Sequence, residues 1–95
     1  MTRITTHVLN TAEGQPAAGV PVSFDGRAAG ETDADGRLFV AEDASAGAHR
    51  IAFVTASLSG FYPEVAIAFN VAPGEEHYHV PLLLSPFGYS TYRGS

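Results

Sequence analysis

The sequence predicts an all-β protein, a sandwich of two packed β-sheets with little or no helix. Apolar residues recur mostly with a period of two, as in strands that bury one face. Gly, Pro, Asn or Asp interrupt this pattern about every ten residues, which is typical of short antiparallel strands. No long amphipathic helical pattern is present, so at most a turn or two is expected near residues 42–46 or 56–60. The length of 95 residues predicts one domain, residues 1–95.

The first expected strand covers residues 3–10, with Ile4, Thr6 and Val8 on one face. Because successive side chains of a strand point to opposite faces, His7 lies on the other face. If the three residues form part of the core, His7 points to solvent or to a partner subunit. Most polar strand residues simply face water, so His7 alone does not establish a site.

The other expected strands lie between turn-forming sequences. Asp25-Gly26 and the Asp-Ala-Asp-Gly sequence at residues 33–36 are typical turns of the first half. Pro73-Gly74 and the Ser-Pro-Phe-Gly sequence at residues 85–88 are their counterparts in the second half. The segments between them alternate or are rich in β-branched and aromatic residues, and they predict strands at residues 20–24, 37–40, 49–55, 65–70, 77–84 and 89–94.

Composition excludes several classes of function. The absence of cysteine rules out disulfides, thiolate metal sites and cysteine nucleophiles. All five basic residues are arginines, so no lysine can form a Schiff base or bind phosphate in a P-loop. The net charge of −5 is opposite to the basic surface that nucleic-acid binding needs. No apolar run has the length of a membrane span or of a signal peptide, so we expect a cytoplasmic protein that binds neither nucleic acid nor membrane.

Two patterns could indicate a metal site. His77 and His79 share one face of an expected strand, but two ligands are too few for a zinc site. Residues 31–42 have the acidic spacing of an EF-hand calcium loop, although strands rather than helices are expected on both sides. We interpret this segment as a β-turn with Gly36 at positive φ, and we predict no metal. Arg37 follows the turn, and its guanidinium could face solvent or hold a developing oxyanion.

The C-terminal segment HYHVPLLLSPFGYSTYRGS, residues 77–95, resembles the signature of the 5-hydroxyisourate hydrolases, the transthyretin-related enzymes of urate breakdown. The final Tyr-Arg-Gly-Ser is its most specific part. Three further blocks resemble the family in the same order: ITTHVLNTAEGQPAAGVPV (4–22), TDADGR (32–37) and FYPEV (61–65). Together the four blocks cover most of the chain.

The resemblance implies a transthyretin-like β-sandwich that hydrolyses 5-hydroxyisourate to 2-oxo-4-hydroxy-4-carboxy-5-ureidoimidazoline in purine catabolism, without metal or cofactor. The family's catalytic residues correspond to His7, Arg37 and His79. One histidine is expected to act as general base for water, and the other to orient water or supply a proton; which is the base stays open. Arg37 would stabilise the oxyanion, and His77 receives no catalytic role. The family's substrate-contacting tail corresponds to Tyr92, Arg93, Gly94 and Ser95.

The resemblance also implies a homotetramer with its active sites in the channel between dimers. Such an assembly would explain why His7 and His79 face away from their own core. The chain departs from the family near residues 25–31 and 56–60, where we expect a clipped hairpin and a helix reduced to a turn. Since the protein and a purine-derived anion are both negative, we expect a local patch of Arg37 and Arg93 to offset their repulsion.

Two other classes of function stay open. Transthyretin itself shows that the same fold can be a non-catalytic carrier of small ligands, although it does not end in Tyr-Arg-Gly-Ser. Residues 14–40 also resemble β-sandwich interaction modules of secreted bacterial proteins. Those modules give no reason for His7, His79 and the C-terminal tetrapeptide to occur together. The hydrolase is therefore the favoured interpretation.

Overall fold

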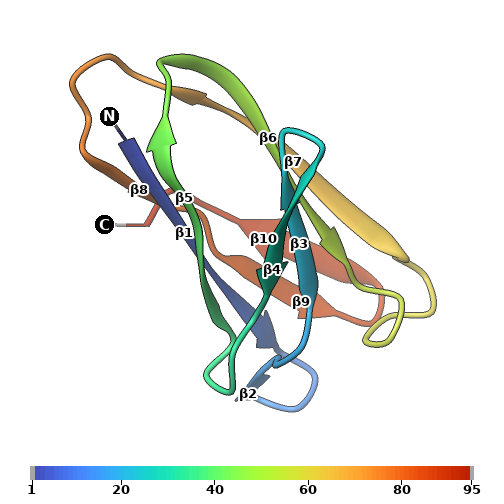
Figure 1. Cartoon of the computed structure of the whole chain (residues 1–95). Helices are drawn as coiled ribbons and strands as arrows, with labels where there is room; N and C mark the ends of the chain where they lie inside the picture. Colours follow the sequence, from blue (N-terminus) through green and yellow to red (C-terminus); the bar gives the residue numbers. More distant parts are fainter. Residues whose placement is uncertain (1, 95) are drawn as a thin grey trace.

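The computed structural model describes residues 2–94, which form two β-sheets packed face to face (Figure 1). No α-helix occurs among these residues, so the predicted all-β sandwich is confirmed. One hydrogen-bonded turn forms at residues 56–58, where the Thr55 carbonyl accepts the N–H groups of Leu58 and Ser59. This is one of the two places where a turn was expected. The described residues contain no helix long and apolar enough to cross a membrane.

The larger sheet is built around β1 (Thr2–Asn10). Along one edge β1 pairs in parallel with β8 (His77–His79) and β9 (Leu82–Ser85), and β10 (Gly88–Thr91) pairs antiparallel with β9. Along the other edge it pairs antiparallel with β5 (Arg37–Ala44) and the short β2 (Gln15–Pro16). Because both edges of β1 are hydrogen-bonded, side chains on its outer face are flanked by those of β5 and β8.

The smaller sheet is antiparallel throughout and follows the order β4 (Arg27–Glu31), β3 (Pro21–Phe24), β6 (Gly47–Val54) and β7 (Glu64–Val71). The expected clipped hairpin is present as a two-residue turn, Asp25-Gly26, between β3 and β4. Both turn residues have positive φ, 51° and 81°, as a tight type I′ hairpin requires. Neither β4 nor β2 was expected from the sequence, because neither contains a run of β-branched or aromatic residues.

Three other predicted strands have different bounds in the structure. The strand expected over residues 77–84 is divided into β8 and β9 at Val80-Pro81, where Pro81 has no N–H to contribute to a ladder. The strand expected over residues 89–94 ends at Thr91, and beyond it Gly94 forms an isolated bridge with His79. The short strand expected at residues 37–40 continues to Ala44, so the turn expected at residues 42–46 is replaced mostly by β5.

The hydrophobic core lies between the two sheets and comes from alternate residues of the central strands. β1 and β9 supply it from the larger sheet, while β6 and β7 supply it from the smaller one. Its most completely buried apolar members, none more than 1% exposed, are Ile4, Val8, Ile51, Phe53, Val65, Leu82 and Leu84. The opposite side chains of β1 are left outside this core, which makes the outer face of the larger sheet available for a site.

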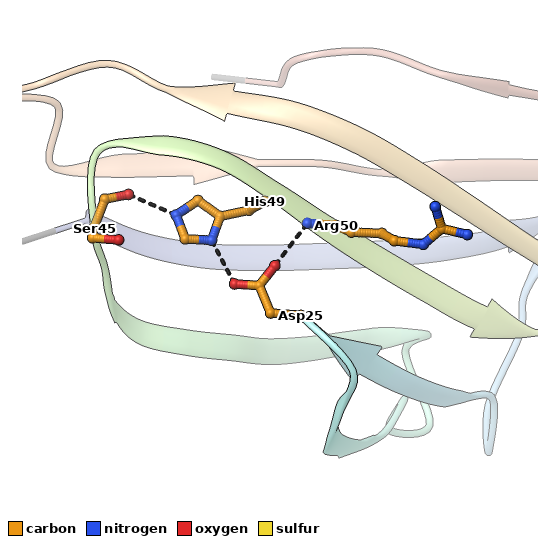
Figure 2. A network of polar contacts seen from close by, with 4 residues as sticks. All are labelled: Asp25, Ser45, His49 and Arg50. Carbon is orange, nitrogen blue, oxygen red and sulfur yellow. Dashed lines mark hydrogen bonds and ion pairs between the residues drawn. The ribbon is translucent and has the colours of Figure 1, made fainter.

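His49 of β6 links two connections between strands (Figure 2). Its Nδ1 lies 2.6 Å from a carboxylate oxygen of Asp25, and its Nε2 lies 2.6 Å from the Ser45 carbonyl oxygen. Since both ring nitrogens face acceptors, both donate when the imidazole is protonated. The hydrogen bond to Asp25 and then that to Ser45 raise the pKa of His49, outweighing burial. Phe24 stacks on the imidazole at 5.1 Å, so this histidine serves packing at the sandwich interior.

Candidate active site

The outer face of the larger sheet gathers the histidines and the arginine that the sequence singled out. In β1, Ile4, Thr6 and Val8 are buried, and His7 is half-buried on the opposite face, as predicted. The antiparallel register with β5 sets His7 directly opposite Arg37. Figure 1 shows β5 and β8 beside β1, so residues from three distant parts of the sequence meet here.

The two histidines of β8 lie on the same outer face. Tyr78 between them is buried in the core, so alternation turns His77 and His79 outward; the sequence predicted that they share one face, and the structure shows that this face is the outer one. The parallel register between β1 and β8 places Thr5 beside His79. His7 and Thr5 are neighbours on the outer face of β1, and therefore the three side chains belong to one surface.

A turn positions Arg37 at the beginning of β5. One carboxylate oxygen of Asp33 accepts the backbone N–H of Asp35 and that of Arg37, each at 2.9 Å. Gly36 has φ +74°, and strands lie on both sides. These contacts confirm the β-turn interpretation of residues 31–42, because the Asp33 carboxylate is engaged by the backbone of the turn itself.

A groove of about 450 Å³ opens over this surface. Arg37, His77 and His79 contribute to its lining, as do the carboxyl groups of Glu31 and Asp33. The groove therefore carries charges of both signs, with the acidic ones on the wall formed by the end of β4 and the turn after it. His7 is not among its lining residues, although its register partner Arg37 is.

The imidazole of His79 is held along two of its edges. The Thr5 hydroxyl lies 2.9 Å from His79 Nδ1 and 2.7 Å from His77 Nε2. On the other edge the chain returns at Gly94, whose N–H donates to the His79 carbonyl at 2.7 Å. A Cβ on Gly94 would come within 2.7 Å of His79 Cδ2, so only glycine allows this approach. Within residues 2–94 no hydrogen-bond partner occupies His79 Nε2.

The electrostatic surroundings of His79 favour its neutral form. Burial lowers the pKa of its imidazole, and the positive charges of Arg37, His7 and His77 lower it further. At neutral pH the ring therefore has an unprotonated nitrogen. Nδ1 is engaged by the Thr5 hydroxyl, so Nε2 can accept a proton from a group in the groove when the hydrogen of the neutral ring is on Nδ1.

The tail residues are divided between two places. Gly94 lies against His79, whereas Arg93 pairs with Glu75 at 3.4 Å and its guanidinium lies 4.3 Å from the centre of the Tyr78 ring. Tyr92 and Arg93 line a second hollow, of about 250 Å³, against β7. Within one chain, Arg93 therefore does not join Arg37 in the expected basic patch. Ser95, the last residue of the predicted tail, lies outside the described residues.

Two residues of the groove, Thr5 and Glu31, were not assigned to the active site from the sequence, although Glu31 was considered there as part of a possible calcium loop. Thr5 is two residues before His7, so alternation alone places both on the outer face of β1. Its contact with His77 and His79 depends on the pairing of β1 with β8, and no local sequence pattern predicts which strands pair. Glu31 ends β4, a strand without a recognisable sequence signal.

Curated relatives resemble this chain over nearly its whole length. A 5-hydroxyisourate hydrolase of Caulobacter vibrioides is 44% identical over 115 aligned positions, covering 100% of both chains. The enzyme of the same name from Salmonella typhimurium is 39% identical, covering 97% of this chain and 80% of its own. The first alignment is longer than the 95 residues of this chain, which agrees with the shortened connections.

Solved structures show the same architecture. Klebsiella pneumoniae 5-hydroxyisourate hydrolase superposes with a TM-score of 0.85 at 36% identity, covering 100% of both chains. Sea bream transthyretin, solved in complex with thyroxine, superposes with a TM-score of 0.81 at 29% identity, covering 96% of this chain and 93% of its own. The fold is thus shared by a hydrolase and by a transthyretin that was solved with thyroxine bound, so the fold alone does not decide between catalysis and ligand binding. Residues 4–94 also match the model of the HIUase/Transthyretin family, and the chain therefore belongs to that family.

Proposed function

We propose that this protein is a 5-hydroxyisourate hydrolase that produces 2-oxo-4-hydroxy-4-carboxy-5-ureidoimidazoline in urate breakdown. The observation that carries the proposal is the meeting of His7, Arg37 and His79 on one outer face beside the groove. A carrier needs a pocket, but it does not need a histidine whose pKa is lowered and whose Nε2 is left without a partner in residues 2–94. The names of the 5-hydroxyisourate hydrolases to which the chain is similar support the same activity.

The reaction adds water across a cyclic amide. The water oxygen bonds to the ring carbonyl carbon and becomes part of the product's carboxyl group. The carbon–nitrogen bond then breaks, and the released nitrogen becomes part of the ureido group after it takes a proton. His79 is the proposed general base, since burial and neighbouring positive charges lower its pKa and keep its ring neutral at neutral pH, and since it lines the groove. General-base assistance of this kind contributes about 10²–10⁴-fold to the rate.

Arg37 and His7 supply the remaining roles. The guanidinium of Arg37 lines the groove and would donate hydrogen bonds to the oxyanion as water adds to the carbonyl. His7, opposite Arg37, would orient the water or return a proton to the leaving nitrogen. Loss of one oxyanion donor typically costs about 10²–10³-fold in kcat. Substituting Arg37 with Gln, which keeps a donor but no charge, should therefore reduce kcat strongly.

We further propose that the protein works as a homotetramer with its active sites between two dimers. The groove is open on the outside of the sheet, where a second subunit could close it. Phe39, which flanks the groove, is 51% exposed in the single chain, and Phe87 is 80% exposed. Phe87 also packs beside the exposed Phe61, with ring centres 6.2 Å apart, and exposed apolar side chains that gather in a patch are typical of surfaces that another subunit covers. Sedimentation equilibrium tests this: a monomer with full activity would contradict the assembly.

A turnover assay tests the activity. Urate oxidase generates 5-hydroxyisourate in place, and the decay of its ultraviolet absorbance is followed with and without this protein, since the compound also decays spontaneously. We expect strong acceleration at catalytic protein concentration, and loss of that acceleration in a folded His79→Ala variant. Decay no faster than the blank, from a folded protein, would refute the hydrolase and favour the carrier.

A further inference from the structure

We infer that Thr5 and His77 are a positioning pair for His79, in which the Thr5 hydroxyl couples the two imidazoles and presents His79 Nε2 to the groove. The catalytic consequence rests on the proposed function. The coupling itself is a property of the ligand-free protein, and it can be measured without substrate. Neither Thr5 nor His77 has another role in the proposed reaction.

The geometry places one oxygen between two ring nitrogens. Thr5 Oγ1 lies 2.7 Å from His77 Nε2 and 2.9 Å from His79 Nδ1, both within hydrogen-bond distance. Thr5 is half-buried in the middle of β1, which is paired with β5 on one edge and β8 on the other. A β-branched side chain on such a strand has few rotamers, so the position of the oxygen is well defined.

Counting hydrogens shows how the two rings become linked. A hydroxyl has one hydrogen to donate and two lone pairs that accept. When His79 carries its hydrogen on Nδ1, it donates to Thr5, and the hydroxyl hydrogen can be donated to His77 Nε2. In this arrangement His79 Nε2 has a free lone pair and can act as a base. When the hydroxyl hydrogen instead points to His79 Nδ1, the neutral ring carries its hydrogen on Nε2 and cannot accept another there.

His77 decides between these arrangements by accepting the hydroxyl hydrogen. Its Nε2 attracts that hydrogen away from His79, which favours the tautomer of His79 that is competent as a base. When His79 takes a proton from water, its Nδ1–H becomes a donor on a cation, and hydrogen bonds of charged groups are stronger than neutral ones. Thr5 therefore stabilises the protonated ring more than the neutral ring.

The charges around His79 explain why a neutral hydroxyl, rather than a carboxylate, suits the position beside its Nδ1. Arg3 is the register partner of His77, and Arg37 and His7 share the outer face with His79. Glu31 and Asp33 line the same groove as Arg37 and His79. A carboxylate in direct contact with Nδ1 would raise the pKa of His79. A hydroxyl orients the ring without adding that negative charge.

Side-chain ¹⁵N chemical shifts of ligand-free protein test the coupling at Thr5. Thr5→Val keeps the branched shape and removes the hydroxyl, whereas Thr5→Ser keeps the hydroxyl. We expect Thr5→Val to change the tautomer populations of His79 and to lower its pKa, and Thr5→Ser to restore both. Thr11→Val is the matched control, because it deletes a hydroxyl just after β1 that donates to the Leu84 carbonyl at 3.0 Å and has no other side-chain partner among residues 2–94. It should leave His79 unchanged.

Two variants of His77 test the same coupling through the His79 tautomer and pKa, and they do so whether or not Thr5→Val folds. His77→Gln keeps an acceptor for the hydroxyl hydrogen and removes a group whose positive charge, when it is protonated, lowers the His79 pKa; that pKa should therefore rise while the tautomer of neutral His79 is kept. His77→Leu removes the acceptor, so the hydroxyl hydrogen is released to His79 Nδ1 and the Nε2–H tautomer should increase. Identical His79 shifts and titration in wild type, Thr5→Val and His77→Leu would overturn the inference.

Kinetics then separate the inference from the proposed function. We expect Thr5→Val to lower kcat for 5-hydroxyisourate about ten- to hundredfold, the range for loss of a hydrogen bond to a charged group, with little change in KM. The acid limb of its pH profile should move to lower pH, and that of His77→Gln to higher pH. Coupled tautomers in a protein that does not hydrolyse 5-hydroxyisourate would refute the proposed function alone. Full activity with an unchanged pH profile in Thr5→Val would refute the positioning pair alone.

Discussion

Substituting Gly94 by Ala tests whether the C-terminal tail positions the imidazole of His79. The added Cβ would lie 2.7 Å from His79 Cδ2, 3.2 Å from its Cβ and 3.3 Å from its Cγ. Carbon atoms pack best at about 3.5–4.0 Å, so the ring or the tail must move by about 1 Å. Thr5 holds the opposite edge of the ring at Nδ1, and the backbone bond from Gly94 N–H to the His79 carbonyl, 2.7 Å long, holds the tail.

Either movement has a measurable cost. Displacing a catalytic group by about 1 Å can reduce the rate about 10²-fold, so kcat/KM for 5-hydroxyisourate should fall about a hundredfold in Gly94→Ala. If the tail moves instead, the loss of its backbone hydrogen bond should lower the free energy of unfolding by about 1 kcal/mol. For a chain of this size that corresponds to a decrease in Tm of about 4–8 °C. The turnover assay and thermal unfolding followed by circular dichroism measure the two quantities.

Gly60→Ala is the matched control for this substitution. Gly60 has no atom within 4 Å of the position of an added Cβ, and its φ is not positive. We therefore expect wild-type kcat/KM and a Tm equal to or slightly above that of the wild type. A Gly94→Ala variant that folds and turns over at the wild-type rate would refute the argument that the tail positions His79.

Three other predictions concern pH and the tail. Because the pKa of His49 is raised in the folded state, the stabilisation that depends on its protonation is complete below the unfolded value of about 6.5 and is lost as the pH rises through the folded pKa. The difference between the denaturation midpoints of wild type and His49→Gln should therefore be largest near pH 5–6 and should shrink at alkaline pH. Because the pKa of His79 is lowered, kcat/KM should decline only below about pH 6.5, and the residual activity of Arg37→Gln should decline at a higher pH than that of the wild type. Glu75→Gln removes an exposed ion pair, so the free energy of unfolding should change by less than about 1 kcal/mol and KM should not rise. Arg93→Gln should raise KM if the tail contacts substrate. A rise in KM in both variants would show instead that the ion pair holds the tail in place.

Local sequence patterns were sufficient for most of the strands. The alternation in residues 3–10 correctly separates the buried Ile4, Thr6 and Val8 from the outward His7. The pair Asp25-Gly26 correctly predicts a tight turn, since both residues tolerate positive φ. These signals act over a few residues, and the physical preferences behind them are present before the chain folds.

Weak strands were not visible in the same way. Residues 27–31, Arg-Ala-Ala-Gly-Glu, have low β-propensity and become β4 because β3 supplies the hydrogen-bonding edge beside them. His49 likewise looked like one residue of an apolar strand. Its contact with Asp25 and Ser45 arises only when the β3–β4 and β5–β6 connections come to the same end of the sandwich.

The sequence alone, through alternation and turn chemistry, predicts an all-β chain in which His7 lies opposite Ile4, Thr6 and Val8, and in which His77 and His79 share one face. It also carries the family resemblance that implied Arg37 and the tail residues as their partners. Only the tertiary structure decides that β1 lies between β5 and β8, which brings Arg37, Thr5 and His79 to one surface and turns Arg93 toward Glu75. The physical reason is that strand pairing depends on hydrogen bonds and core packing between residues far apart in the chain, which no short-range pattern contains.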